Sequence, residues 1–420
     1  MEASEREYPL IKRIFANEFE GFVEIRLIRD DSRFDSRSKM ELVDIRKEID
    51  ALDEEMAKLF VRRMNCADRV AEAKRGTGKP VLDPGREREI LAKVAERVGP
   101  GLETEGRLLF STLMSISRGR QRARLADDGR FAKMMADAMS ATPALFAAKA
   151  TVACPGAEGG YSQQAAVSFV QFPSILYFRD FESVFAAVEQ GMCDYGVLPI
   201  ENSTAGSVTQ VYDLMAKHDF RIAKAVKLRI RHVLLAPKGV KLADVREIAS
   251  HPHALAQCAE FLKAHKGIRA IPASNTAAAA AELAKSGRTD AAVVAARECA
   301  ELYGLDILAD DISDTPSNFT RFICISRKTE IYPDANKFSL MMSLPHRPGA
   351  LADILIRFAA VGVNLTKLES RPVVGSDFEF RFIFDFEASP HDGRVVKLLS
   401  SLASDPAVEH FTFLGAYAEK

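Results

Sequence analysis

The sequence predicts a multidomain protein in which an all-α segment is followed by a two-lobed α/β segment and an α+β segment. Apolar residues recur with a 4-3-4-3 spacing from Ile45 to Leu59, which is typical of a long helix with a helical partner. From Ala150 onward, short apolar strands alternate with helical stretches. Phenylalanine then occupies every second position from Phe378 to Phe386, the period of a strand with one covered face.

These patterns divide the chain into five regions. We expect an extension at residues 1–39, an all-α domain at 41–125, a helical linker at 126–149, a two-lobed α/β domain at 150–327 and an α+β domain at 336–420. Two interpretations of residues 1–39 stay open. Met40 is followed at once by a helical pattern, so it could be the native start; alternatively, the segment is a genuine extension with a short strand.

Composition and charge exclude several classes of protein. Hydrophobic residues make up 47% of the chain, charged residues 27%, and the net charge is -1, which gives no reason to expect nucleic acid or an anionic membrane as a partner. No apolar run reaches the length of about 18 residues that a membrane span needs. The six cysteines are scattered without a CxxC pair, so we expect reduced thiols in a cytoplasmic protein.

The first predicted helix carries cations at positions where apolar residues are expected. Arg63 continues the apolar seam, and Lys74 lies about three turns further along nearly the same face. Arg46 points about 80–100° away from both. A charge on a buried seam is costly without a partner, so these cations suit an anionic ligand. The alternative is a helical bundle with solvated charges.

Two shorter helices follow in the same domain. Asp83 and Pro84 predict an N-cap and a proline at the first helical position. Glu87 falls on the buried stripe of that helix, and the stripe of the next helix turns polar at Ser117 and Gln121. Three helices are too few to bury the long seam, so we expect a dimer that shares it.

The α/β segment offers a cleft and three polar stretches. Asn202 and Ser203 follow one strand, whereas Ser250 precedes a capped helix that carries Gln257. In Ser317–Phe322, strand alternation places Thr320 and Arg321 on opposite faces. Two lobes joined by crossing strands imply a small-molecule site between them. The glycines after residue 155 could hold an anion at a helix N-terminus, but their spacing is not that of a dinucleotide fingerprint. His251 and His253 lack a third ligand at metal spacing, so no metal site is predicted.

The C-terminal pattern predicts a βαββαβ sandwich. The alternating phenylalanines need a helical layer over them, and Gly349 opens a helix after Pro348. Small residues there would let an amino-acid carboxylate approach free backbone N–H groups. A purely structural dimerisation module is the alternative.

The N-terminal motifs resemble the all-helical chorismate mutase family. The resemblance rests on residues 45–53, Arg63, residues 73–74 and residues 83–88. It implies a mutase site made of Arg46, Arg63, Lys74, Asp83, Arg86, Glu87, Ser117 and Gln121, with Lys74, Gln121 and Glu87 as catalytic residues. In that family one arginine of the first helix comes from the partner subunit, and Arg46 fits this role.

The remaining motifs resemble prephenate dehydratase, with its periplasmic-binding-protein-like fold, and a ferredoxin-like ACT domain, a regulatory amino-acid-binding module. The dehydratase resemblance implies Thr320 as the catalytic residue, with substrate contacts from Asn202, Ser203, Ser250, Gln257, Thr320 and Arg321. The ACT resemblance implies an effector site of Gly349, Ala350, Leu351, Asn364, Glu369, Ser370 and Arg371.

The order of the three modules is that of the bifunctional chorismate mutase–prephenate dehydratases, the P-proteins. The resemblance implies conversion of chorismate to prephenate and then to phenylpyruvate in phenylalanine biosynthesis, with no cofactor and no metal. It also implies L-phenylalanine as an inhibitor and a homodimer or homotetramer. The alternative from another class is a non-catalytic ACT-linked amino-acid sensor. A fusion to prephenate dehydrogenase is disfavoured because no GxGxxG follows a strand.

Overall fold

The computed structural model describes residues 35–125, 129–373 and 379–420. The chain forms two compact units, residues 1–66 and residues 67–420. Its first described helices are α1 (Asp35–Lys74), α2 (Pro84–Val98), α3 (Glu103–Leu125) and α4 (Arg130–Ala141). None of the described helices has both the length and the apolar character that crossing a membrane requires.

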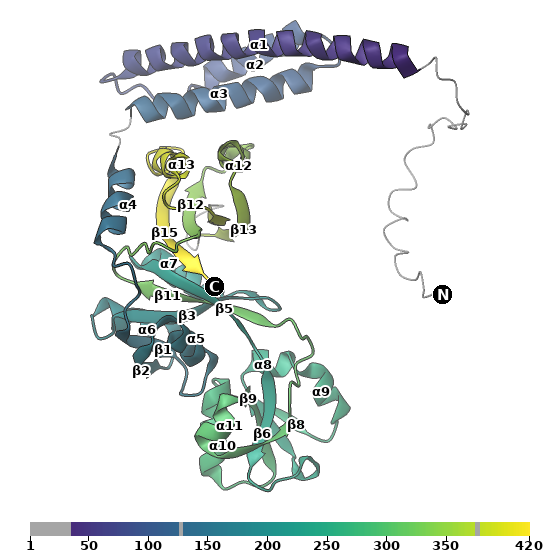
Figure 1. The fold of residues 1–420 in the computed structure, drawn as a ribbon, viewed down its shortest axis with the longest axis vertical. Helices are drawn as coiled ribbons and strands as arrows, with labels where there is room; N and C mark the ends of the chain where they lie inside the picture. Colours follow the sequence, from purple (N-terminus) through teal and green to yellow (C-terminus); the bar gives the residue numbers. More distant parts are fainter. Residues whose placement is uncertain (1–34, 126–128, 374–378) are drawn as a thin grey trace. The chain divides into compact units, whose positions relative to one another are not determined.

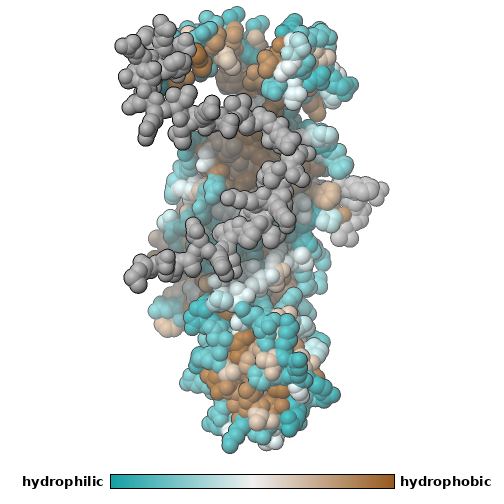
Figure 2. All heavy atoms as spheres, turned by 90° about the vertical axis from the view of Figure 1, so that its right-hand side faces the viewer, coloured by the Kyte–Doolittle hydropathy of each residue, from teal (hydrophilic) through white to brown (hydrophobic). Residues whose placement is uncertain are grey.

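The apolar seam of α1 reaches the surface. Its members Ile45, Ile49, Leu52, Met56 and Leu59 are each 49–58% exposed. Figure 2 shows apolar residues, in brown, at the surface near the upper end of the view. The sequence predicted a helix that begins near residue 41, but α1 begins at Asp35 and so includes the end of the expected extension. Residues 1–34 of that extension lie outside the described residues.

A central sheet forms the first lobe of the α/β region. Its elements are β1 (Lys149–Pro155), α5 (Tyr161–Phe169), β2 (Phe172–Phe178), α6 (Phe181–Glu189), β3 (Tyr195–Asn202), β4 (Gly206–Ser207), α7 (Thr209–Lys217), β5 (Arg221–Arg229) and β11 (Phe319–Ser326). The strand order is β5-β11-β3-β1-β2, and β4 pairs with β3. Strands β1, β2 and β3 are parallel, whereas β11 runs antiparallel to both neighbours.

A separate sheet forms the second lobe, at the lower end of Figure 1. Its elements are β6 (His232–Pro237), η2 (Leu242–Asp244), β7 (Glu247–Ser250), α8 (Pro252–Ala256), α9 (Ala259–Ala264), β8 (Arg269–Pro272), α10 (Thr276–Ser286), β9 (Ala291–Ala296), α11 (Glu298–Tyr303) and β10 (Leu305–Ala309). The sequence predicted one long strand from Ile222 to Leu235. The structure has two instead, because the chain leaves the first sheet after β5 and enters the second at β6.

The C-terminal region has the predicted βαββαβ order. Its elements are β12 (Lys337–Leu344), α12 (Ala350–Val361), β13 (Asn364–Pro372), β14 (Phe380–Glu387), α13 (Gly393–Ala403) and β15 (Glu409–Glu419). Helices α12 and α13 cover one face of the sheet (Figure 1), where Phe384 stacks on Phe358 at a centroid distance of 5.6 Å. The predicted helical layer is therefore confirmed for Phe382, Phe384 and Phe386, which pack in one core with residues of α12 and α13; Phe380 is not part of that core, and Phe378 lies outside the described residues.

The C-terminal sheet continues the central sheet of the first lobe. Strand β15 pairs antiparallel with β12 and, at its far end, parallel with β5 through Ala418 opposite Lys224. The joint order is β13-β14-β12-β15-β5-β11-β3-β1-β2. One apolar cluster contains Ile323 of β11 together with Ile383 and Leu414 of the C-terminal strands. The two regions therefore share a core.

Candidate active sites

A cavity of about 760 Å³ lies between the two lobes. Residues from both lobes line it, among them Asn202 and Thr320 from the first and His232, Gln257 and Asn275 from the second. The sequence predicts a small-molecule site between the lobes, and this cavity has the size of such sites. It brings together three predicted residues, Asn202, Gln257 and Thr320.

Thr320 and Asn202 face each other across neighbouring strands. They are paired in the register of β11 and β3, and Asn202 Nδ2 donates to Thr320 Oγ1 at 2.9 Å. The register of this ladder shifts between Arg321 and Phe322: Arg321 lies opposite Glu201, but Phe322 lies opposite Pro199, so Ile200 is skipped. Such irregularities commonly lie beside active sites, where they aim a side chain away from the regular ladder. Because Thr320 Oγ1 accepts from Asn202, its own proton is free to be donated.

The side-chain oxygen of Asn202 organises the turn that follows β3. It accepts hydrogen bonds from Thr204 N at 3.0 Å, Thr204 Oγ1 at 2.7 Å and Ala205 N at 2.9 Å. Gln257 Nε2 donates to Thr204 Oγ1 at 3.0 Å, while Gln257 Oε1 accepts from Asn318 Nδ2 at 2.9 Å. The amide of Gln257 therefore links the second lobe to the polar residues around Thr320.

His232 extends this linkage to the first lobe. Its Nε2 lies 3.0 Å from Gln257 Oε1, and its Nδ1 lies 3.1 Å from the hydroxyl of Tyr161. Burial lowers the pKa of the His232 imidazole below its ordinary value, which favours a neutral ring. A neutral imidazole held by two fixed partners is a rigid part of the cavity wall.

Positive potential at the cavity wall comes from helix N-termini and an arginine, and is opposed by the carboxylate of Asp180, which also lines the cavity and caps α6. Helices begin at its wall with their N-terminal residues at Tyr161 (α5), Phe181 (α6), Thr209 (α7) and Thr276 (α10). The N-terminal ends of helices carry partial positive charge. Arg179, the residue after β2, is the only lysine or arginine lining the cavity in the described part of the chain.

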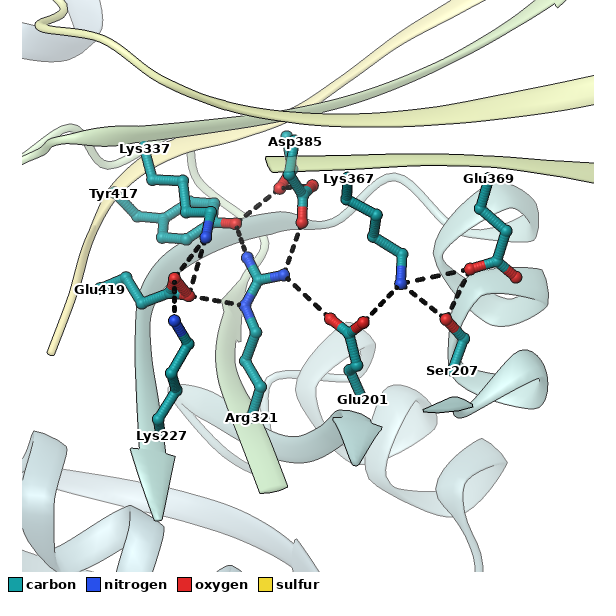
Figure 3. A network of polar contacts seen from close by, with 11 residues as sticks. Glu201, Ser207, Lys227, Arg321, Lys337, Lys367, Glu369, Asp385, Tyr417 and Glu419 are labelled. Atoms are coloured by element: carbon teal, nitrogen blue, oxygen red, sulfur yellow. Dashed lines mark hydrogen bonds and ion pairs between the residues drawn. The ribbon is translucent and has the colours of Figure 1, made fainter. Parts of the chain in front are cut away.

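Three predicted substrate contacts lie elsewhere. Ser203 Oγ donates to Ser317 O at 2.9 Å and accepts from Phe319 N at 2.9 Å, so it fastens the loop before β11. Ser250 is fully buried and donates to Val294 O at 2.5 Å. Arg321 points to the face of β11 opposite Thr320, toward the C-terminal sheet (Figure 3). None of the three lines the cavity, because strand alternation or core packing directs them away.

The predicted mutase residues on α1 and α2 are partly engaged with the protein itself. Lys74 Nζ donates to Pro80 O at 2.7 Å and to Val81 O at 3.1 Å. Asp83 caps α2 by accepting from Arg86 N at 3.0 Å, with Pro84 next in the chain, as predicted. Arg86 is exposed and pairs with Glu89 at 2.5 Å.

Glu87 and the two polar residues of α3 lie at partly or fully buried positions. The Glu87 carboxylate accepts a hydrogen bond from Arg118. Ser117 is half-buried, and Gln121 is buried with its Oε1 lacking a hydrogen-bond partner among the described residues. Arg46 and Arg63 belong to the other unit, residues 1–66, where Arg46 is exposed and Arg63 is half-buried.

The predicted effector residues fall into two groups. Gly349 adopts a left-handed conformation at φ 79° directly before α12, followed by buried Ala350 and half-buried Leu351, while Asn364 and Ser370 are exposed on β13. The other group faces the first lobe. Glu369 accepts from Ser207 Oγ at 2.5 Å, and Arg371 Nε lies 3.8 Å from Asp213 of α7.

Sequence reasoning missed four residues of the cavity region: Thr204, His232, Asn318 and Arg179. Asn318 precedes Thr320 by two positions, so the strand period could have placed both on one face. Arg179 follows a parallel strand, at the edge of a sheet where ligands of α/β proteins gather. No local signal marks His232, since its role depends on contacts with Gln257 and Tyr161.

Family models match the chain in three consecutive regions. The model described as "Chorismate mutase type II" matches residues 45–122, "Prephenate dehydratase" matches residues 152–330 and "ACT domain" matches residues 338–404. A solved structure of prephenate dehydratase from Arthrobacter aurescens, in complex with L-Phe, is 34% identical with a TM-score of 0.58. That match covers 64% of this chain and 89% of that chain.

Curated relatives match over different lengths. Arogenate dehydratase/prephenate dehydratase 2 of Arabidopsis thaliana is 41% identical over 253 residues, or 57% of this chain, and the match spans 66% of the plant protein. The bifunctional chorismate mutase/prephenate dehydratase of Aquifex aeolicus is 32% identical over 389 residues, covering 90% of this chain and 98% of that protein. The chain therefore belongs to the bifunctional chorismate mutase/prephenate dehydratases and carries both enzyme domains of that family, followed by an ACT domain.

Proposed function

We propose that the chain rearranges chorismate to prephenate in its helical domain, converts prephenate to phenylpyruvate in the cavity between the lobes, and is inhibited by L-phenylalanine. The observation that carries the dehydratase part is the Thr320–Asn202 hydrogen bond at the wall of that cavity. The free cysteines, five of them buried, support the expected cytoplasmic location.

The dehydratase step removes CO2 and hydroxide from prephenate, and aromatisation of the ring supplies the driving force. A group that donates a proton or hydrogen bond to the departing hydroxyl performs general-acid work. Thr320 is the proposed donor, because Asn202 occupies a lone pair of its oxygen and leaves its proton free. A threonine hydroxyl is a poor acid in water, so Thr320 acts as a hydrogen-bond donor or relay.

The two carboxylates of prephenate need positive potential. The N-terminal ends of four helices supply it through backbone N–H groups, and Arg179 adds a full charge. Asn202 and Gln257 hold the polar residues around Thr320 in place. Prephenate is preferred here to the arogenate named for the plant relatives, because the helical domain produces prephenate itself.

The mutase step is an intramolecular rearrangement that requires neither a nucleophile nor a cofactor. It requires a folded dicarboxylate, held by Arg46 and Arg63, and donors at the ether oxygen, where negative charge develops. Lys74 and Gln121 are the proposed donors. Lys74 uses two of its three donors on backbone carbonyls, which leaves one for the substrate.

The other proposed mutase contacts are polar and charged groups around the ring: Asp83, Arg86, Glu87 and Ser117. The exposed apolar seam of α1 supports a homodimer or homotetramer, in which Arg46 enters the site of the partner subunit. A second copy of the same seam is the partner whose spacing matches it.

L-phenylalanine is the proposed effector of the ACT domain. The first turn of α12 has backbone N–H groups that can receive a carboxylate, and it is formed by Gly349, Ala350 and Leu351. The next strand, β13, carries two exposed polar residues, Asn364 and Ser370. The L-Phe complex of the Arthrobacter dehydratase supports this choice of ligand. Glu369 and Arg371 have partners in the first lobe, so we assign them to the domain contact instead.

A two-activity assay tests the proposal. Chorismate is supplied to the wild type and to Thr320→Ala, and chorismate loss and phenylpyruvate formation are followed by ultraviolet absorbance. We expect chorismate consumption within about twofold of wild type and a loss of phenylpyruvate formation of about 100-fold or more. Prephenate and arogenate are then compared directly as substrates. A wild-type protein that leaves chorismate unchanged would favour the amino-acid sensor, and full dehydratase activity in Thr320→Ala would refute its role.

A further inference from the structure

The strand pair β3/β11 has a cavity face and an ACT face. Thr320 lies opposite Asn202 in the ladder, and the next pair along is Arg321 opposite Glu201. Thr320 and Asn202 line the cavity, whereas Arg321 and Glu201 point toward strands of the ACT domain (Figure 3). Each proposed active-site residue is therefore the chain neighbour of a charged residue that contacts the ACT domain.

Arg321 is held by three groups of the ACT domain. Its Nη1 lies 2.5 Å from Asp385 Oδ2 of β14, its Nη2 donates to the hydroxyl of Tyr417, and its Nε lies 2.9 Å from Glu419 Oε2 of β15. The side chains of Arg321, Asp385 and Glu419 are 2–8% exposed. Lys337 also binds Glu419, which balances the buried charges.

The electrostatics of this cluster favour the ionised forms of Arg321 and Glu419. Burial alone would lower the pKa of Arg321, but Tyr417, Asp385 and Glu419 raise it above its ordinary value. Burial alone would raise the pKa of Glu419, yet Arg321 and Lys337 hold it below its ordinary range. Removing one partner of such a cluster leaves a buried charge uncompensated, which is strongly destabilising. The position of Arg321 is consequently fixed by the ACT strands.

A second set of contacts starts at Glu201. Its Oε2 lies 3.7 Å from Arg321 Nη1, and its Oε1 lies 3.0 Å from Lys367 Nζ of β13. Lys367 Nζ also donates to Ser207 Oγ at 2.6 Å, and Ser207 lines the cavity. Figure 3 shows Arg321, Glu201, Lys367 and Ser207 in one row between the ACT strands and the first lobe.

The local ladder explains why such anchoring matters. The register between β11 and β3 shifts directly after Arg321, so the regular ladder with β3 ends one residue beyond Thr320, whereas the ladder with β5 stays regular as far as Cys324. An anchor on the next residue restricts the backbone at Thr320 from the opposite face of the strand. A displacement of the order of 1 Å at a reacting group can cost about 100-fold in rate.

We propose that Arg321, together with Asp385, Glu419 and Glu201, is a positioning device for the dehydratase step, so that the ACT sheet forms part of the wall that orients Thr320 and Asn202. The proposal rests on the assigned role of Thr320. Arg321 acts through its neighbour and does not touch the substrate.

The first test is Asp385→Asn, which keeps the shape of the side chain and removes its charge. We expect the dehydratase kcat to fall about 10- to 100-fold, KM for prephenate to stay within about threefold, and the chorismate mutase activity of the same protein to stay unchanged. Asp405→Asn is the matched control. Asp405 is an equally buried aspartate of the ACT domain, and its carboxylate pairs with Arg122 of α3 and Arg357 of α12.

The control separates positioning from general stability. Both substitutions should lower Tm, but only Asp385→Asn should lower the dehydratase kcat. Equal kcat losses in the two variants, or an unchanged kcat in Asp385→Asn, would overturn the proposal. Glu201→Gln, at a more exposed position, gives the same kcat test if Asp385→Asn does not fold.

The second test combines Asp385→Asn with Thr320→Ala. If Asp385 acts through Thr320, the double variant should be no slower than Thr320→Ala alone, because the group being positioned is already absent. Losses that multiply would show an independent effect and overturn the inference. The single variant Thr320→Ala reports separately on the proposed function: if it alone keeps full activity, the role of Thr320 fails, and the positioning proposal fails with it.

Discussion

The side-chain amide of Asn202 donates to the hydroxyl oxygen of Thr320 at 2.9 Å, across the ladder between β3 and β11. This direction of donation leaves the Thr320 proton available to the cavity. The same amide nitrogen also donates to Asn318 Oδ1 at 2.9 Å, so its orientation is fixed by two acceptors. Because the nitrogen of the Asn202 amide, and not its oxygen, faces Thr320, the hydroxyl proton of Thr320 can be donated to a ligand in the cavity.

Asn202→Asp tests this arrangement with almost no change in shape. A carboxylate oxygen at the place of Nδ2 would attract the Thr320 proton away from the substrate and face Asn318 Oδ1 without a donor. We expect the dehydratase kcat to fall about 10- to 100-fold, as for a hydrogen bond of about 1–3 kcal/mol. Steady-state assays with prephenate measure this. An Asp variant as active as wild type would mean that Asn202 does not set the direction of the Thr320 proton.

Arg179 should contribute to substrate affinity more than to turnover. Among the described residues, Arg179 is the one lysine or arginine that lines the cavity. It follows β2, which lies on the opposite side of β3 from the strand that carries Thr320. Arg179→Ala should raise KM for prephenate about 10-fold or more and leave kcat within about threefold, as expected for a contact made equally before and during the reaction. Arg327→Ala is a suitable control, since Arg327 is exposed in the same lobe and does not line the cavity. A fall in kcat alone would contradict the assignment.

The mutase site should be shared between subunits. Arg46→Ala and Arg63→Ala should each abolish most mutase activity, but mixed dimers contain one site with both arginines intact. After random subunit exchange, about a quarter of the sites should be active. Chorismate consumption by the mixture measures this, with mass spectrometry to verify exchange. Exchange without recovery would place both arginines in the site of one subunit.

Glu369 should affect inhibition by phenylalanine through the domain contact. It accepts from Ser207 and lies 3.2 Å from Lys367, so it joins the ACT edge strand to a residue of the cavity wall. Glu369→Gln should shift the concentration of half-maximal inhibition by about 5-fold or more, a typical coupling energy being about 1–3 kcal/mol. Phenylalanine binding to the same variant is measured by calorimetry.

Glu387→Gln, at an exposed position at the end of β14, is the control and should behave as wild type. If Glu369→Gln abolishes phenylalanine binding altogether, Glu369 is a ligand of the effector and not a link between the domains.

The stability of the dehydratase domain should fall as pH drops below about 6.5. Burial holds the pKa of His232 below its ordinary value of 6.5, so the unfolded chain takes up a proton there that the folded chain does not. Above that value both states are neutral at this residue and the effect vanishes. We expect His232→Gln to reduce the difference in Tm between pH 7.5 and pH 5.5. An unchanged difference would assign the pH dependence to other groups.

Local patterns in the sequence predicted the order of the all-α, α/β and α+β regions, the Asp83 cap, a helical layer over the phenylalanines and the opposite orientations of Thr320 and Arg321. They could not tell which face of β11 borders the cavity, because that depends on what packs against each face. Arg321 therefore looked like a substrate ligand, although its partners Asp385 and Glu419 lie 64 and 98 positions further along the chain. Ser250 also looked like a substrate ligand. It is buried instead, because its hydroxyl donates to Val294 O on another strand, a contact that local sequence does not reveal.

The pairing of β15 with β5 has a consequence for biosynthesis of the protein. The dehydratase strands are complete once residue 326 has been made. Among the described strands, the one that pairs with the edge strand β5 is β15, which is translated last. At about 5–20 residues per second, the ribosome needs roughly 5–20 s for the intervening chain. During that interval β5 is an open edge, the type of surface that recruits strands from other chains. Gly415, where a Cβ would lie 2.4 Å from Ile222 O, lets the late strand approach β5 closely enough to close it.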